Sequence, residues 1–159
     1  MRLTQTGEYA LRAMAYMANL PPGQAVRARD LAVPTAVPPH YLSKLMRQLV
    51  VAGLIHSQKG HGGGFVLARP PQEITLEDVL AATHVSLVQE ECAFGWHHCN
   101  SGRPCPLHEA WSRLKVACLR WARDTTLADL QGADLTVFQE RMAEAPVMSS
   151  FRSAVANRP

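Results

Sequence analysis

The 159-residue chain lacks any run of 18 apolar residues, the length that a membrane span requires, so we expect no membrane partner. Charged residues supply 18% of the chain and aromatic residues 6%, whereas hydrophobic residues supply 47%, which fits a globular class and excludes wholesale disorder. Cysteine is scarce, with four residues, and a chain of this size folds without a disulfide framework. The polar N-terminal segment lacks the pattern of a signal peptide, which predicts a cytoplasmic protein.

Catalytic patterns are also missing. The sequence offers no nucleophile–base pair and no paired carboxylates. The glycine-rich segment 58–64 is not followed by Lys-Ser/Thr and a helix, as a nucleotide phosphate loop would be. These absences argue against an enzyme.

Charge is distributed unevenly along the chain. Residues 1–70 carry eight Lys or Arg against two acidic residues, whereas residues 71–159 carry eight against eleven. A basic front half suggests contact with a polyanion, most often nucleic acid. A solvated surface with chance asymmetry would give the same counts, so charge alone does not decide between the two interpretations.

Hydrophobic periodicity predicts helices over 3–20, 26–33, 40–52 and 107–124, and a helix start at Thr75. Thr6 is the expected N-cap of the first helix, and Pro34 is expected to cut the second. Two short apolar runs, 54–57 and 65–68, flank the glycine-rich segment and predict a β-hairpin. The fold class is therefore mainly α with a small hairpin, in the order of a winged helix-turn-helix followed by a long helix.

In such a fold the third helix enters the DNA major groove, and the hairpin, or wing, enters the minor groove. The candidate DNA-binding residues on the helix and at the wing tip are Pro39, His40, Tyr41, Ser43, Lys44, Arg47, Lys59, Gly60 and His61. Lysine and arginine suit phosphates, and arginine also recognises guanine. Each feature also has a competing interpretation: Lys44 and Arg47 as ordinary solvated charges, Tyr41 as a core residue, and the glycine-rich segment as a flexible turn.

A loop over residues 90–106 carries three cysteines, and a histidine follows in the pattern C-x6-C-x5-C-x2-H: Cys92, Cys99, Cys105 and His108. Four such ligands in a short segment suit a small metal site. The wide spacing favours an iron–sulfur cluster over zinc, whose sites usually show C-x2-C pairs, and a cytosolic disulfide is the remaining alternative. His97 and His98 are spare candidate ligands. Cys118, on the apolar stripe of the last helix with Trp111, Leu114 and Trp121, is expected to be a buried small hydrophobe.

Together these motifs resemble the Rrf-type winged-helix transcription regulators. The residues that carry the resemblance are Met1–Thr4, Tyr9–Ala13, Tyr41–Leu45, Leu49, Ala52–Leu54, Lys59–Ala68, Ile74–Val79, the three loop cysteines and Thr126–Leu130. The resemblance covers residues 1–130, and its specificity lies in the ordered set rather than in any one motif. The sequence departs from the family pattern at the wing, where Lys59 replaces a common arginine, and at Pro34, Ala36 and Ser43.

The resemblance implies a homodimer that binds a double-stranded DNA operator and carries an iron–sulfur cluster on Cys92, Cys99 and Cys105. His108 matches the IscR-like fourth ligand, which favours 2Fe–2S. Glu8 matches the carboxylate that NsrR-like members supply from the other subunit, with 4Fe–4S. The expected units are a DNA-binding domain over 1–84, a cluster loop over 85–106, a dimerisation region over 107–131 and a flexible tail over 132–159.

Overall fold

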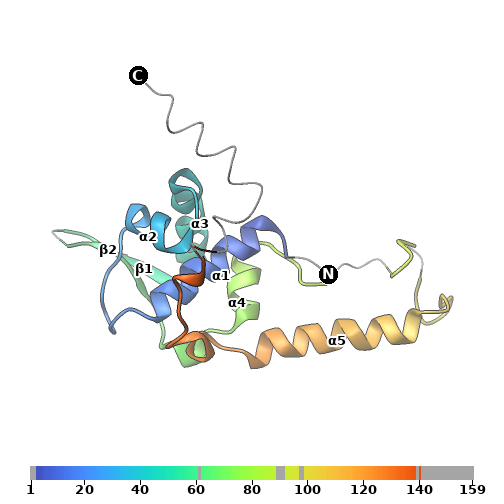
Figure 1. The fold of residues 1–159 in the computed structure, drawn as a ribbon. Coiled ribbons are helices and arrows are strands. Elements are labelled where there is room, and N and C mark those ends of the chain that lie inside the picture. Colours follow the sequence, from blue (N-terminus) through green and yellow to red (C-terminus); the bar gives the residue numbers. More distant parts are fainter. Residues whose placement is uncertain (1–2, 61, 89–91, 97–98, 139, 141–159) are drawn as a thin grey trace, which may run out of the picture.

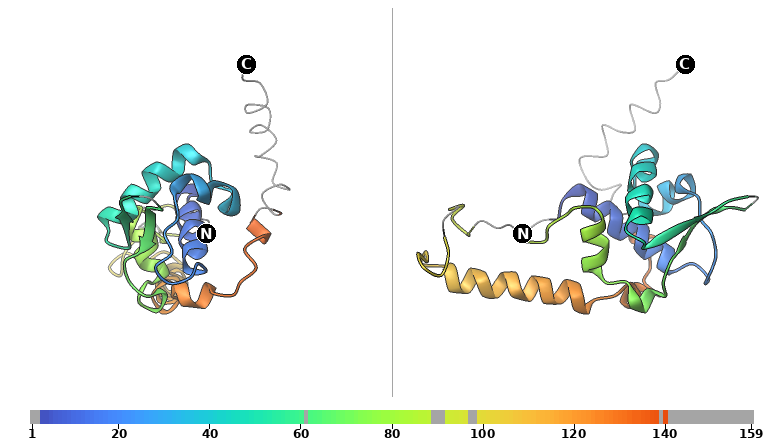
Figure 2. Two further views of the ribbon diagram at one scale, coloured as in Figure 1. Left: turned by 90° about the vertical axis from the view of Figure 1, so that its left-hand side faces the viewer. Right: turned by 180° about the vertical axis from the view of Figure 1, so that it is seen from behind.

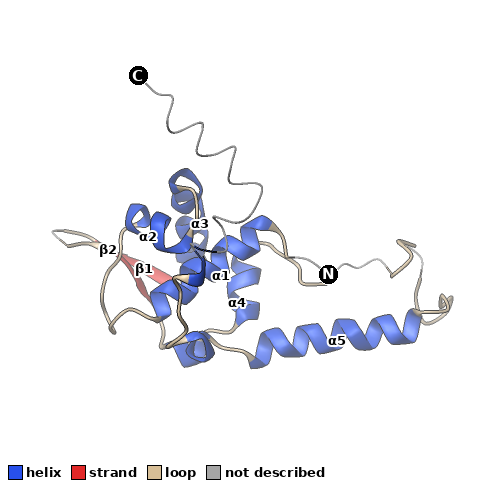
Figure 3. Ribbon diagram, viewed as in Figure 1, coloured by secondary structure: helices blue, strands red, loops and turns tan. Residues whose placement is uncertain are grey.

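The computed structural model describes residues 3–60, 62–88, 92–96, 99–138 and 140. Five α-helices and two strands make up most of this part of the chain (Figures 1 and 3), in agreement with the predicted class. The elements are α1 (Gln5–Ala18), α2 (Ala28–Thr35), α3 (Pro39–Val51), β1 (Ile55–Gln58), β2 (Gly64–Leu67), η1 (Pro71–Glu73), α4 (Leu76–Ala82), α5 (His108–Asp124) and η2 (Leu127–Leu130).

Helix α1 forms the centre of the core. Its apolar stripe, which includes fully buried Ala13 and Met14, packs mainly against α2 and α4 and shares one core with the buried leucines of α3. The N-cap is Thr4, whose hydroxyl accepts a hydrogen bond from the Gly7 N–H at 3.3 Å. The prediction of Thr6 was wrong because Thr6 lies inside the helix, and its hydroxyl is instead 2.9 Å from that of Tyr41.

Helix α2 continues through Pro34, contrary to the prediction that this proline would cut it. The proline has no N–H to donate to the Asp30 carbonyl, so the helix lacks that hydrogen bond and ends one residue later, at Thr35. The hydroxyl of Thr35 donates to the Leu31 carbonyl at 2.5 Å, and the N–H of Ala36 closes the C-terminus. Ala36 itself adopts the left-handed conformation, with φ of 52°, that directs the chain into α3.

The wing is an antiparallel pair in which Ile55 faces Leu67 and Gln58 faces Gly64. Val26, just before α2, adds a short bridge to β2: its N–H donates to the Phe65 carbonyl, and its carbonyl accepts from the Phe65 N–H. Backbones come so close at this bridge that a Cβ on Gly64 would lie 2.6 Å from the Val26 oxygen. The glycine therefore allows the wing to pack against the start of α2.

Helix α5 extends from the body formed by α1–α4 and the wing as a long arm (Figures 1 and 2). Of its residues only Ala122 is buried, and Leu114, Val116 and Trp121 are about half exposed. The body-side end is anchored by two backbone hydrogen bonds, from Leu76 N–H to the Thr125 carbonyl and from Leu127 N–H to the Ile74 carbonyl, each 2.9 Å. Cys118 is half-buried, so the expectation of a buried hydrophobe was wrong: it lies on α5, where Ala122 alone is buried.

In the described part of the chain every helix is too short or too polar to cross a membrane. The predicted tail over 132–159 lies mostly outside the described residues, since position 139 and residues 141–159 are not among them.

Candidate DNA-binding surface and cysteine centre

The N-terminal half of α3 presents an exposed polar row. His40, Ser43, Lys44 and Arg47 are all exposed, and spacings of three and four residues place them on one side of the helix. The opposite side carries Leu42, Leu45, Met46 and Leu49, which are buried against the core. Pro39, also exposed, is the first residue of the helix. This amphipathic division leaves the predicted recognition residues accessible to a ligand.

Tyr41 differs from the rest of the predicted set because it is half-buried. Its hydroxyl pairs with Thr6 of α1, and its ring meets that of Tyr9 edge-on, with 5.2 Å between the centroids. The Tyr9 hydroxyl in turn accepts a hydrogen bond from Gln5 at 2.8 Å. Tyr41 therefore links α3 to α1, and the structure leaves its hydroxyl less accessible than its neighbours on the exposed row.

The wing tip places Lys59 and Gly60 in full contact with solvent, whereas His61 lies outside the described residues. A hydrogen bond from the Gly63 N–H to the Gly60 carbonyl, 3.0 Å long, closes the turn. The guanidinium of Arg27 donates to the Gly63 carbonyl at 3.5 Å. Arg27 is exposed and is a second cation, after Lys59, near the wing turn. No sequence motif pointed to Arg27, because the approach of Val26 to β2 is a tertiary contact.

The three loop cysteines converge in the segment that precedes α5. Figure 1 shows that this segment lies at the end of α5 that points away from the body. Their Sγ atoms all lie within 4.8 Å of one another, with Cys92 and Cys105 buried and Cys99 half-buried. His108, the first residue of α5, places its Nδ1 atom 3.2 Å from the Sγ atom of Cys99. The predicted set Cys92, Cys99, Cys105 and His108 is thus brought together in one place.

Hydrogen bonds and burial shift the pKa values of Cys92 and Cys99 in opposite directions. Burial raises the pKa of Cys92, but the backbone N–H groups of Trp96 and Phe94 and the two neighbouring thiols outweigh it, so this pKa lies below its ordinary value. For Cys99 the N–H of Cys105 lowers the pKa. Burial and the neighbouring Cys105 and Cys92 thiols raise it by more, so the net shift of this pKa is upward. Cys92 is therefore the more readily ionised of these two thiols.

This donor set fits a thiolate-bound metal centre. Deprotonated thiols are the ligands that zinc and iron–sulfur clusters take from proteins, and N–H groups directed at sulfur stabilise the negative charge that such a centre carries. The sulfurs converge in the fold, so the wide spacing along the chain no longer separates a cluster from a tetrahedral zinc ion. His97 and His98 lie outside the described residues.

Glu8, the alternative fourth ligand, lies on α1 in the body rather than beside the cysteines of its own chain. Its carboxylate is 3.6 Å from the guanidinium of Arg12, whose carbon Cζ lies 5.5 Å from the centroid of the Tyr9 ring. The Nη1 atom of Arg12 is buried without a hydrogen-bond partner. Within one chain, His108 is the better placed of the two candidates.

The fold and the exposed cationic row define a winged-helix DNA-binding transcriptional regulator, and comparisons with known proteins agree. Residues 3–133 match the Rrf2 family model, described as an iron-dependent transcriptional regulator. The chain belongs to the Rrf2 family.

The relatives are transcriptional regulators rather than enzymes. The chain is 34% identical over 131 residues to the HTH-type transcriptional regulator NsrR of Geobacillus kaustophilus, covering 82% of this chain and 89% of that protein. It is 32% identical over 144 residues to an HTH-type regulator of Mycobacterium tuberculosis, covering 91% and 89%.

Solved structures confirm the fold. CymR, described as the global cysteine regulator of B. subtilis, superposes with a TM-score of 0.72 at 26% identity, over 84% of this chain and 99% of that one. IscR of T. potens gives a TM-score of 0.65 at 25% identity, over 82% and 85%. Both neighbours match this chain over more than four fifths of its length.

Proposed function

We propose that this chain regulates transcription by binding an operator with an affinity set by an iron–sulfur cluster on Cys92, Cys99 and Cys105, with His108 as fourth ligand. The observation that carries the proposal is the convergence of three sulfurs within 4.8 Å, with the His108 Nδ1 atom 3.2 Å from one of them. A bound cluster would supply a redox- and nitric-oxide-sensitive group. Three thiolates and one imidazole favour 2Fe–2S, whereas recruitment of Glu8 from a second subunit would favour 4Fe–4S.

For DNA binding we infer that the exposed row of α3 enters the major groove and that the wing contacts the minor groove. Lys44 and Arg47 would neutralise phosphates, while His40 and Ser43 lie where base edges or phosphates come within reach. Lys59 and Gly60 at the tip would approach the backbone, with His61 beside them in the sequence. A protein that binds an operator acts where the DNA is, so the proposed localisation is cytoplasmic.

A homodimer completes this proposal. The arm leaves Leu114 46% and Trp121 50% exposed on one face, with Cys118 half-buried between them, and such a face requires an apolar partner. A second copy, packed through the same face, would place two wings on a two-fold symmetric site. In this arrangement residues 1–84 bind DNA, 85–106 hold the cluster and 107–131 form the interface.

The decisive experiment is a visible absorption spectrum of protein purified without oxygen, combined with iron and sulfide analysis. Brown protein that contains both elements supports the cluster, and their ratio to protein separates 2Fe–2S from 4Fe–4S. Colourless protein with one zinc per chain would replace the cluster with a structural metal. The triple variant in which all three loop cysteines are alanine serves as the matched blank.

A thiol-based regulator without a cluster is the second candidate, favoured by the similarity to CymR. All four cysteines are free, and the depressed pKa of Cys92 makes this thiol the more reactive partner of Cys99. Colourless, metal-free protein whose DNA affinity changes on treatment with a disulfide reagent would support this candidate over the cluster.

A further inference from the structure

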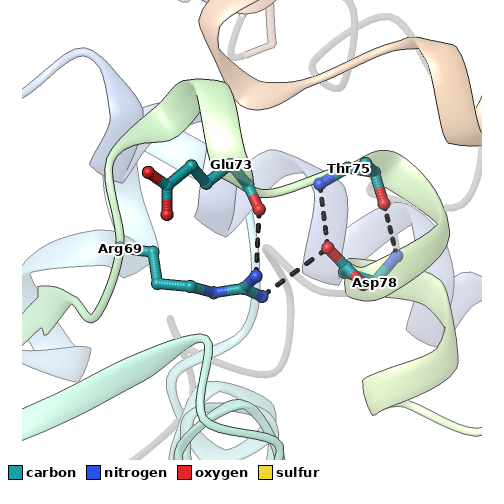
Figure 4. Close-up of polar contacts among 4 residues, drawn as sticks. All are labelled: Arg69, Glu73, Thr75 and Asp78. Atoms are coloured by element: carbon teal, nitrogen blue, oxygen red, sulfur yellow. Dashed lines mark hydrogen bonds and ion pairs between the residues drawn. The ribbon is translucent and has the colours of Figure 1, made fainter.

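Arg69 ties the base of the wing to the body (Figure 4). It follows β2, at the opposite end of the hairpin from the tip. One end of its guanidinium, Nη1, donates to the Glu73 carbonyl at 3.0 Å, and the other, Nη2, lies 3.6 Å from Oδ2 of Asp78. The side chain therefore spans from the end of the wing to η1 and to the first turn of α4.

The acceptor on α4 is itself held in place. Asp78 and Thr75 form a capping box in which the Thr75 N–H donates to Asp78 Oδ2 and the Asp78 N–H donates to the Thr75 hydroxyl, each at 3.1 Å. Figure 4 shows the same carboxylate facing both Thr75 and Arg69. Arg69 thus contacts a fixed group rather than a freely rotating side chain.

Neighbouring acids on this turn hold different parts of the molecule. Asp78 contacts Arg69 at the wing, whereas Glu77 accepts a 2.9 Å hydrogen bond from Arg123 at the end of α5. Thr75 also bridges to Thr126, which follows α5. The first turn of α4 is therefore a junction between the wing and the arm.

We propose that Arg69 is a positioning residue for DNA binding, which fixes the angle at which the wing leaves the body. A two-stranded hairpin has little stability of its own and takes its orientation from what it packs against. The inference rests on the proposed use of the wing in DNA binding. Because both ends of the guanidinium are engaged and the tip lies at the far end of the hairpin, Arg69 acts through the wing and not on a phosphate.

The test compares four variants of the full-length chain: R69A, R69K, D78N and R123A. The probe is a duplex that the wild-type protein selects from a random-sequence pool, and the dissociation constant is measured as a function of salt. R123A is the matched control, because it also removes one positive charge and one ion pair to α4 but leaves the wing contact intact. Urea unfolding of each variant reports separately on stability.

We expect R69A to weaken binding about threefold to fivefold, the range that the loss of one partly exposed ion pair allows, with an unchanged salt slope. D78N should also weaken binding, although removing a negative charge from a DNA-binding protein would by itself strengthen it. R69K should fall between wild type and R69A, because lysine keeps the charge but cannot span both acceptors. R123A should bind more tightly than R69A, and light scattering of both variants checks that loss of the Arg123 contact has not altered the oligomeric state.

Equal affinities of R69A and wild type would overturn the inference. A salt slope reduced by about one in R69A, with tighter binding by D78N, would also overturn it and identify Arg69 as a phosphate contact. If D78N does not fold, the comparison of R69A with R69K decides, since Arg69 lies outside the helices. Failure of wild-type protein to select any duplex at low salt would instead refute the proposed DNA-binding function.

Discussion

The Nδ1 atom of His108 lies 3.2 Å from the Sγ atom of Cys99, and the two residues reach this position from different segments, the first turn of α5 and the loop before it. The contact gives the cysteine centre a fourth donor in the same chain. It also joins the beginning of α5 to the loop that carries the cysteines.

Alanine at Cys92, Cys99 or Cys105 is expected to abolish the visible chromophore of anaerobically purified protein, because each removes one thiolate of the centre. H108A should lower the iron retained and alter the spectrum. C118A is the control and should keep both, since Cys118 lies along α5 away from the converging sulfurs. Unchanged spectra for all three loop variants would refute the site.

K44A and R47A are expected to weaken DNA binding across sequences and each reduce the salt slope by about one, because every neutralised phosphate releases counterions. Electrophoretic mobility shifts or fluorescence anisotropy over a salt series measure this. R113A, which loses an exposed cation of the arm, should keep the wild-type slope. Identical slopes for all the proteins would exclude the proposed docking of α3.

L114D is expected to convert a dimer into a monomer, because it places a charge on the apolar face of α5 that we assign to the interface. Light scattering or sedimentation gives the mass. V116D is the matched control: Val116 is also exposed, but a helix of 3.6 residues per turn places it on the opposite side. Dissociation by V116D and not by L114D would reverse the assignment of faces.

G64A is expected to destabilise the wing, because the new Cβ would lie 2.6 Å from the Val26 carbonyl oxygen. Forced overpacking of this kind typically costs about 1–3 kcal/mol. Urea unfolding should show the loss, accompanied by weaker DNA binding. G102A, where a Cβ would meet only the end of the Asn100 side chain at 3.3 Å, should unfold as wild type does.

Acidification should remove a contribution of Asp129 to stability. The N–H and hydroxyl of Thr126 donate to this carboxylate and lower its pKa in the folded chain. A depressed carboxyl pKa stabilises the fold fully above the unfolded pKa, and the contribution disappears as pH falls through the folded value. The Tm of D129N should therefore approach that of wild type at the acidic end of a pH series, and a difference that is independent of pH would contradict this.

Local patterns predicted much of the fold. The apolar spacing in α1 and α3 and the Thr75 cap signal directly which groups become buried or paired. The predictions for Thr6 and Pro34 failed because the role of each residue depends on its position within the helix and on its tertiary contacts. Thr6 pairs with Tyr41 of α3, and α2 extends one residue beyond Pro34 although this proline has no N–H to donate.

For the site, the spacing of the cysteines indicated that they form one centre, and the fold brings them together. The sequence did not indicate how Tyr41 is oriented, because that depends on the approach of α1 to α3. It also gave no sign of the contact between Arg69 and Asp78, since the direction of a long side chain follows from the turn through η1. Local hydrophobic periodicity does not predict contacts of this kind, because they depend on how the elements pack.

The separation of the arm from the body also divides the chromophores of the chain. Its three tryptophans, Trp96, Trp111 and Trp121, lie on the cysteine loop or α5, whereas its three tyrosines, Tyr9, Tyr16 and Tyr41, all lie in the body. Light absorbed only by indole therefore excites the arm and the cysteine loop, where the backbone N–H of Trp96 faces the Cys92 sulfur. Tryptophan emission from the unlabelled protein therefore reports on the arm and the cysteine loop without a contribution from the body.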